Sequence, residues 1–129
     1  MATELVTSPR TVLVVEDEIL LLNMLVGELI EAGIQSIQAK TADEALQILT
    51  SSRRVDLVLT DIRMPGSIDG LGLARHVRSE WPHMKIVLMS AYLWDMSEAA
   101  VADAFLCKPF PLAAAIDCVD RLLVEVCNP

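Results

Sequence analysis

Three chemically active positions of this sequence each follow a short apolar run. Asp61 ends the run Leu57–Thr60, acidic residues 16–18 follow a run of leucine and valine, and Lys108 follows a third run. Such runs are typical of strands that are buried on both faces of a parallel sheet. Open α/β sheets place their chemistry at the carboxyl ends of the strands, so we expect the acids and the lysine to form one site.

The residue types at these strand ends favour phosphoryl transfer. Carboxylates held close together raise each other's pKa unless a cation neutralises them, and Mg²⁺ is the cation that suits carboxylate oxygens and water. A carboxylate beside such a cation can accept a phosphoryl group, so we predict that Asp61 is the nucleophile. Lys108 and Ser90, at the ends of the two later strands, are placed to hold the phosphoryl oxygens.

The elements that must position these residues alternate along the chain. Apolar runs predict strands at 11–15, 34–39, 56–60, 85–89 and 104–107. Periodicity and capping signals predict helices at about 18–32, 42–50, 70–80 and 111–126, with a loop and a short helix between 92 and 102. Repeated βα units with short connections predict an α/β fold in which helices cover both faces of a parallel sheet.

Length and composition predict one domain. With 129 residues, 53% hydrophobic and 22% charged, the chain is not expected to be disordered. Residues 1–10 are expected to form a short leader and residues 11–127 a single domain, with no output domain. The apolar runs are far shorter than the about 20 residues that span a bilayer, and the N-terminus lacks the features of a signal peptide. We therefore expect a cytoplasmic protein that makes no membrane contact.

The charge balance and the cysteines exclude two further classes. Ten Lys and Arg stand against eighteen Asp and Glu, for a net charge of −8, which opposes binding to nucleic acid. Cys107, Cys118 and Cys127 lack any Cys-x-x-Cys pairing, so we expect reduced thiols without a metal or redox role.

Four short segments at strand ends carry a resemblance to a known family. They are Val15-Glu16-Asp17-Glu18, residues 60–66, Met89-Ser90-Ala91 and Lys108-Pro109-Phe110. Together, and in this order, they resemble the receiver domain of two-component response regulators, over about residues 11–126. The resemblance implies a flavodoxin-like (βα)5 fold, a three-layer sandwich with parallel sheet order 2-1-3-4-5.

The resemblance also implies a role for each residue of the site. Asp61 would be the phosphoacceptor. Asp17 and Asp61 would bind Mg²⁺ directly, while Glu16 would act through water and Arg63 would supply its backbone carbonyl. Lys108 would pair with the phosphate, and its peptide bond to the following proline would be cis.

The resemblance further implies a signalling switch. Ser90 would bind a phosphoryl oxygen and, together with Phe105 at the aromatic switch position, would report phosphorylation; Phe105 as plain core is the alternative. The donor would be a histidine kinase or a histidine phosphotransfer protein, and phosphorylation would change which partner the chain binds, a homodimer included. Because this chemistry is partly self-catalysed and is reset rather than turned over, we do not expect an ordinary enzyme.

Three departures from the common receiver pattern affect the expected chemistry. Ser67-Ile68 makes one loop longer by a residue, and Phe105 replaces a frequent tyrosine. Arg63 and Tyr92 are bulky at the positions that flank the expected path of the hydrolytic water. We predict from these two residues a slowed or altered autodephosphorylation.

The first helix is unusually apolar and allows two interpretations. One stripe on its surface consists of Ile19, Leu22, Val26 and Ile30. Either this stripe is buried in part under the last helix, or it is a docking surface for a partner helix, since receivers meet phosphotransfer helices near this element.

Other functions fit the residues less well. A phosphatase or phosphotransferase of the haloacid dehalogenase type needs an Asp-x-Asp pair, whereas Asp61 is followed by Ile62-Arg63. An unphosphorylated scaffold would have no use for the intact acids. A mononucleotide site would need a Gly-rich loop after the first strand, and none is present.

Overall fold

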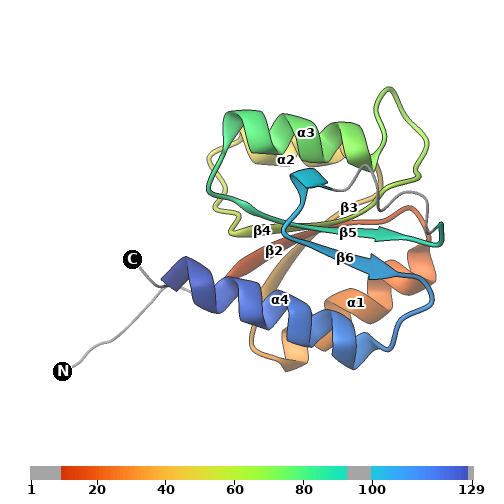
Figure 1. Cartoon of the computed structure of the whole chain (residues 1–129), viewed down its shortest axis with the longest axis vertical. Helices are drawn as coiled ribbons and strands as arrows, with labels where there is room; N and C mark the ends of the chain where they lie inside the picture. Colours follow the sequence, from red (N-terminus) through yellow and green to blue (C-terminus); the bar gives the residue numbers. More distant parts are fainter. Residues whose placement is uncertain (1–9, 93–99, 128–129) are drawn as a thin grey trace.

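The structure is a computed structural model that describes residues 10–92 and 100–127, in which one parallel sheet lies between two layers of helices (Figure 1). The strands are β2 (Thr11–Val15), β3 (Gln35–Ala39), β4 (Leu57–Asp61), β5 (Lys85–Ser90) and β6 (Ala104–Cys107). They pair in parallel in the order β3-β2-β4-β5-β6. In chain order this is 2-1-3-4-5, so the predicted sheet is confirmed.

Among the described residues, two helices cover each face of the sheet (Figure 1). Helices α1 (Ile19–Glu31) and α4 (Leu112–Cys127) cover one face, and α2 (Ala42–Thr50) and α3 (Gly70–Glu80) cover the other. Their bounds agree with the predicted ones to within one or two residues. The further short helix predicted between 92 and 102 falls mainly on residues 93–99, which lie outside the described residues.

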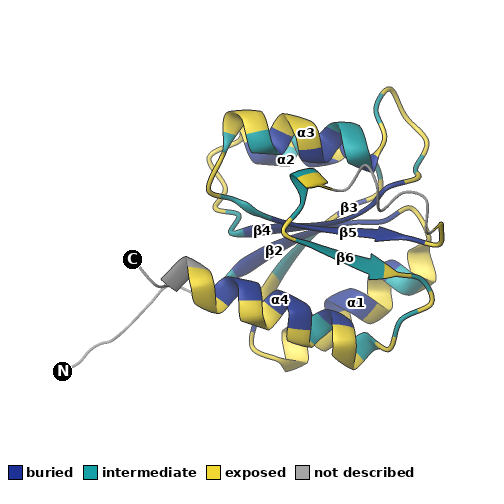
Figure 2. Ribbon diagram, viewed as in Figure 1, coloured by how far each residue is buried: buried dark blue, intermediate teal, exposed yellow. Residues whose placement is uncertain are grey.

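The central strands are apolar on both faces because each face packs against helices. Alternate residues point to opposite sides of a strand. In β2, Val12 and Val14 join the core beneath α1 and α4, while Leu13 and Val15 join the core beneath α2 and α3. The same division holds along β4 and β5, whose residues are buried almost throughout (Figure 2). Burial on both sides therefore explains why these strands read as continuous apolar runs rather than as alternating ones.

The docking stripe predicted on helix α1 is only partly at the surface. Leu22 is 1% exposed and Val26 is also buried, both in the core that α1 shares with α4, so their assignment to a docking surface is wrong. The alternative, that part of the stripe is covered by the last helix, is correct for these two residues. Ile19 and Ile30 are 46% and 62% exposed, and they lie at opposite ends of the helix.

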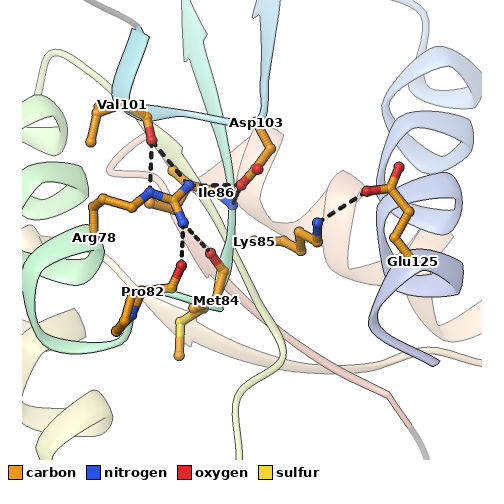
Figure 3. Close-up of polar contacts among 8 residues, drawn as sticks. All are labelled: Arg78, Pro82, Met84, Lys85, Ile86, Val101, Asp103 and Glu125. Carbon is orange, nitrogen blue, oxygen red and sulfur yellow. Dashed lines mark hydrogen bonds and ion pairs between the residues drawn. The ribbon is translucent and has the colours of Figure 1, made fainter. Parts of the chain in front are cut away.

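Arg78 of α3 links the segments that precede β5 and β6 (Figure 3). Its guanidinium donates hydrogen bonds to the Asp103 carboxylate, at 2.9 Å, and to the backbone carbonyls of Val101, Pro82 and Met84. The same Asp103 carboxylate accepts from the backbone N–H of Ile86 at 2.8 Å. Nearby, Lys85 pairs with Glu125 of α4 at 3.0 Å. This network connects the amino ends of β5 and β6 to α3 and α4, at the opposite end of the strands from Ser90 and Lys108.

Within the described part of the chain, none of the helices has the length and apolar character that a membrane span requires.

Candidate functional site

Three carboxylates meet at the carboxyl edge of the sheet. Asp61 is the last residue of β4, while Glu16 and Asp17 directly follow the neighbouring strand β2. The chain leaves β2 for β3 on one side of it and later returns to β4 on the other, so this edge is the switch point where open α/β sheets bind ligands. One oxygen from each of the three carboxylates lies within 4.8 Å of the other two. The predicted convergence of these acids is therefore present in the structure.

The three acids differ in their exposure to solvent. Glu16 and Asp61 are 1% and 7% exposed, whereas Asp17 is exposed. Glu16 is held in place on both oxygens, since Oε2 accepts from the backbone N–H of Glu18 at 3.1 Å and Oε1 contacts a lysine. A cation entering from solvent would thus meet Asp17 first and the two buried carboxylates behind it.

Lys108 contacts both buried carboxylates and offsets part of their charge. Its Nζ lies 2.8 Å from Glu16 Oε1 and 3.3 Å from Asp61 Oδ2. The lysine directly follows β6, and its backbone N–H donates to the carbonyl of Ser90 at 2.8 Å, which fixes its position beside β5. The peptide bond from Lys108 to Pro109 is cis, as the resemblance implied.

Burial and charge together shift the pKa values of this cluster. Burial raises the pKa of Asp61 above its ordinary 3.8, although Lys108 and the backbone N–H of Arg63 offset part of the increase. Burial likewise raises the pKa of Glu16 above 4.5. For Lys108, burial acts to lower the pKa, but its contacts with the two carboxylates outweigh burial and raise the pKa above 10.5. The buried carboxylates are thus costly to ionise and would gain from a further cation.

Ser90 and Tyr92 lie at the end of β5, next to the strand that carries Asp61. Ser90 is buried, and it follows Met89, the residue paired with Asp61 in the sheet. The Ser90 hydroxyl oxygen accepts a hydrogen bond from the backbone N–H of Tyr92 at 3.0 Å. The Tyr92 ring in turn faces the loop after β4, where the guanidinium carbon of Arg63 lies 4.6 Å from the ring centroid. Sequence reasoning placed Arg63 and Tyr92 at the same opening but did not predict their contact.

Phe105 lies in the edge strand β6 and is half-buried against the core beneath α2 and α3. This position agrees with a core role in the state described. Its role as a switch stays a prediction.

An apolar groove of about 340 Å³ lies beside the acidic cluster, between the start of α1 and the turn after β6. Its lining residues are Glu18, Leu20, Leu21, Met24, Ala91, Lys108, Pro109 and Phe110. Lys108 belongs to both the groove and the acidic cluster, so the two sites are contiguous. Sequence reasoning missed Leu20 and Met24, although both are exposed apolar residues on the first helix, because periodicity alone does not tell which face the last helix covers.

The comparison with protein families identifies the class. The model of the response regulator receiver domain matches residues 12–120, and the chain therefore belongs to this family. The response regulator protein FleR of Pseudomonas aeruginosa is 35% identical over 114 residues, which are 85% of this chain and 24% of FleR. The sensor kinase CckA of Brucella abortus is 36% identical over 127 residues, 95% of this chain and 13% of CckA. The chain thus spans a quarter or less of the length of these relatives.

Solved structures agree with the family and the fold. The response regulator protein TrrA of Thermotoga maritima, in complex with Mg²⁺-BeF, has a TM-score of 0.81 at 35% identity and covers 88% of this chain and 98% of its own. A CheY-like response regulator receiver domain protein of Methanospirillum hungatei has a TM-score of 0.84 at 26% identity, over 92% of this chain and 96% of its own.

Proposed function

We propose that the chain accepts a phosphoryl group on Asp61 from a phosphohistidine donor. The observation that carries this proposal is the position of the Asp61 carboxylate, which lies among two further carboxylates and 3.3 Å from the Lys108 ammonium group. Membership of the receiver family supports it. So does the similarity to TrrA, whose structure holds Mg²⁺-BeF.

The donor atoms of the cluster fit Mg²⁺, which prefers carboxylate and carbonyl oxygens and retains water ligands. Asp17 and Asp61 would bind the ion directly, Glu16 would act through water, and Arg63 would contribute its backbone carbonyl. When bound, Mg²⁺ would neutralise negative charge that develops on the phosphoryl oxygens. The raised pKa values of Glu16 and Asp61 support this assignment, because a divalent cation relieves the cost of ionising them.

The side chains of the chain itself then have distinct tasks. A carboxylate oxygen of Asp61 attacks phosphorus, the P–N bond to the donor histidine breaks, and the imidazole keeps the bonding electrons and takes up a proton. Lys108 remains paired with the acceptor and stabilises the charge of the transferred group. The Ser90 hydroxyl donates to a phosphoryl oxygen. The product is an acyl phosphate on Asp61.

The donor would be a histidine kinase or a histidine phosphotransfer protein that docks on the groove beside α1. The groove is apolar, shares Lys108 with the acidic cluster and opens next to it. A donor that covers exposed Leu20 and Met24 would place its phosphohistidine near the acceptor. Ile19, at the same end of the helix, stays in the proposed surface.

Phosphorylation would change which partners residues 11–127 bind. The rearrangement would involve Ser90, Phe105 and the face formed by β6 and α4. The chain would be phosphorylated and reset rather than turn over an outside substrate. With a chromogenic phosphate ester we therefore expect no catalytic hydrolysis.

Intact mass spectrometry tests the proposal. Wild-type protein incubated with acetyl phosphate and Mg²⁺ should gain the mass of one phosphoryl group, and Asp61→Asn should gain none. Removal of Mg²⁺ with a chelator should abolish the gain in wild type. A wild-type mass that does not change would contradict the proposed function.

A further inference from the structure

The loop between β4 and α3, residues 62–69, forms one wall of the acidic site. At its base, the N–H of Ile62 donates to the carbonyl of Met89 at 2.9 Å, and the N–H of Gly70 donates to the carbonyl of Ile62 at 2.8 Å. The first residue beyond this base is Arg63, whose backbone N–H hydrogen-bonds to the Asp61 carboxylate. The position of the loop therefore decides where the backbone of Arg63 lies relative to the acceptor.

Asp43 of helix α2 holds the far side of this loop. Its Oδ2 accepts from the backbone N–H of Ser67 at 3.0 Å, and its Oδ1 accepts from the Ser67 hydroxyl. The preceding residue is Gly66, with a φ of +128°, and a Cβ built there would lie 2.6 Å from Asp43 Oδ2. Glycine at this position thus permits both the turn and the close approach of the carboxylate.

Asp43 lies in the first turn of helix α2, which is capped by hydrogen bonds. Thr41 caps helix α2 by accepting from the N–H of Glu44 at 3.0 Å, and Glu44 in turn accepts from the N–H of Lys40 at 2.8 Å. Asp43 lies inside this capped first turn, so its side chain projects from a rigid element. The hydrogen bonds from Ser67 lower the pKa of Asp43 below 3.8, because they favour its ionised form.

We propose that Asp43 is a positioning residue for the metal site, which acts by holding Ser67 and, through the loop, the backbone of Arg63 against Asp61. This proposal rests on the proposed function, because the Arg63 carbonyl is one of the proposed Mg²⁺ ligands. It also gives a role to the extra loop residue noted in the sequence, since Ser67 supplies both hydrogen-bond donors. Groups that orient the ligands of a metal contribute roughly ten- to a hundredfold to its affinity.

A purely structural role is the alternative. An acid in the first turn also stabilises its own helix through the helix dipole, and Asp43 would then affect the thermal stability but not the metal site. The two roles differ in three measurements: the affinity for Mg²⁺, amide exchange in the loop, and the response to a change at Ser67.

The test compares Asp43→Ala, Asp43→Asn and Ser67→Ala with Asp120→Ala, which removes one exposed charge from α4. Mg²⁺ affinity is measured by calorimetry, and hydrogen exchange of the Ser67 and Arg63 amides is measured in metal-free protein. Asp43→Ala should weaken Mg²⁺ binding about tenfold and speed exchange at both amides. Asp43→Asn and Ser67→Ala, which each keep part of the contact, should be intermediate. Asp120→Ala should match wild type.

An Asp43→Ala protein that is less stable but binds Mg²⁺ as wild type does, with unchanged amide exchange at Arg63, would overturn the positioning role. Failure of the proposed function looks different. In that case wild type itself takes up no phosphoryl group from acetyl phosphate, while amide exchange in metal-free protein still reports whether Asp43 holds the loop.

Discussion

The guanidinium of Arg63 packs over the ring of Tyr92, with its central carbon 4.6 Å from the ring centroid. The two residues come from different loops, one after β4 and one after β5, and they meet near Asp61, the proposed acceptor. A cation–π contact of this kind contributes about 0.5–1 kcal/mol at an exposed site. The contact between Arg63 and Tyr92 connects the loop after β4 with the loop after β5. We expect a hydrolytic water to approach Asp61 from this side.

Disrupting this contact should shorten the lifetime of the acyl phosphate. We expect Arg63→Asn and Tyr92→Ala each to speed autodephosphorylation severalfold, because either change opens the path of the water. Since the two side chains share one contact, the double variant should dephosphorylate little faster than either single variant. Decay of the phosphorylated mass after removal of acetyl phosphate measures the rate. Lifetimes equal to wild type in both single variants would refute the prediction.

Replacing Lys108 by methionine should separate metal binding from phosphorylation. The Lys108 ammonium contacts Glu16 at 2.8 Å and Asp61 at 3.3 Å, so its positive charge opposes the entry of a second cation. We expect Lys108→Met to bind Mg²⁺ about three- to tenfold more tightly at low salt, and yet to be phosphorylated more slowly, because the lysine no longer stabilises the transferred charge. Calorimetry and intact mass give the two readouts. Weaker Mg²⁺ binding would show that the lysine organises the carboxylates instead.

Asp61→Asn should stabilise the metal-free protein at neutral pH. The pKa of Asp61 is raised above 3.8 in the folded state, so near these pH values the folded protein binds more protons than the unfolded chain. Stability therefore falls as the pH rises from 3.8 through the raised pKa of the folded state. The asparagine removes this loss, and its advantage in melting temperature should disappear below pH 3.8. Thermal unfolding against pH checks this.

Stabilisation by Mg²⁺ is a second measurement on wild type and Asp61→Asn. At ten times its Kd, Mg²⁺ should stabilise wild type by about 1.4 kcal/mol and Asp61→Asn much less. Equal stabilisation of both would remove Asp61 from the metal site.

Gly70 is required by the close approach of helix α3 to β4. A Cβ at Gly70 would lie 1.7 Å from the carbonyl oxygen of Asp61, so backbone would have to move. We expect Gly70→Ala to cost about 3 kcal/mol or more, or to prevent folding. Gly27 is the matched control, because a Cβ there meets nothing within 4 Å in the middle of α1. Gly27→Ala should stabilise by about 0.5–1 kcal/mol. Thermal or denaturant unfolding compares the two.

The groove beside α1 should affect phosphotransfer from a protein donor but not from a small-molecule donor. Leu20→Glu or Met24→Glu should slow phosphotransfer from the cognate kinase at least about tenfold, which corresponds to a loss of about 1.4 kcal/mol in the free energy of docking. Phosphorylation by acetyl phosphate should be unchanged. Ile30, which the sequence places on the same stripe, lies at the far end of the helix and outside the lining of the groove, so we do not include it in the proposed docking surface. Ile30→Glu introduces the same charge there and should behave as wild type. If Ile30→Glu alone impaired transfer, the docking surface would lie elsewhere on the helix.

The sequence by itself determined that the acids and the lysine of the candidate site lie at strand ends. An apolar run such as Leu57–Leu59 reports burial on both faces, and Asp61, two residues later, can lie only near the carboxyl edge of the sheet. Glu16, Ser90 and Lys108 follow from the same argument, because each one lies at the end of its own strand. Strand order is not encoded so locally, and it came from the resemblance of these segments to the receiver family.

Only the tertiary structure decided how segments from different elements meet. Helix α1 is apolar on several sides, and the position of α4 determined that Leu22 is buried while Leu20 remains at the surface. The contacts of Arg63 with Tyr92 and of Asp43 with Ser67 each join loops or helices that are distant in sequence. No local pattern records such pairs, because their distance depends on how the helices and loops pack around the finished sheet.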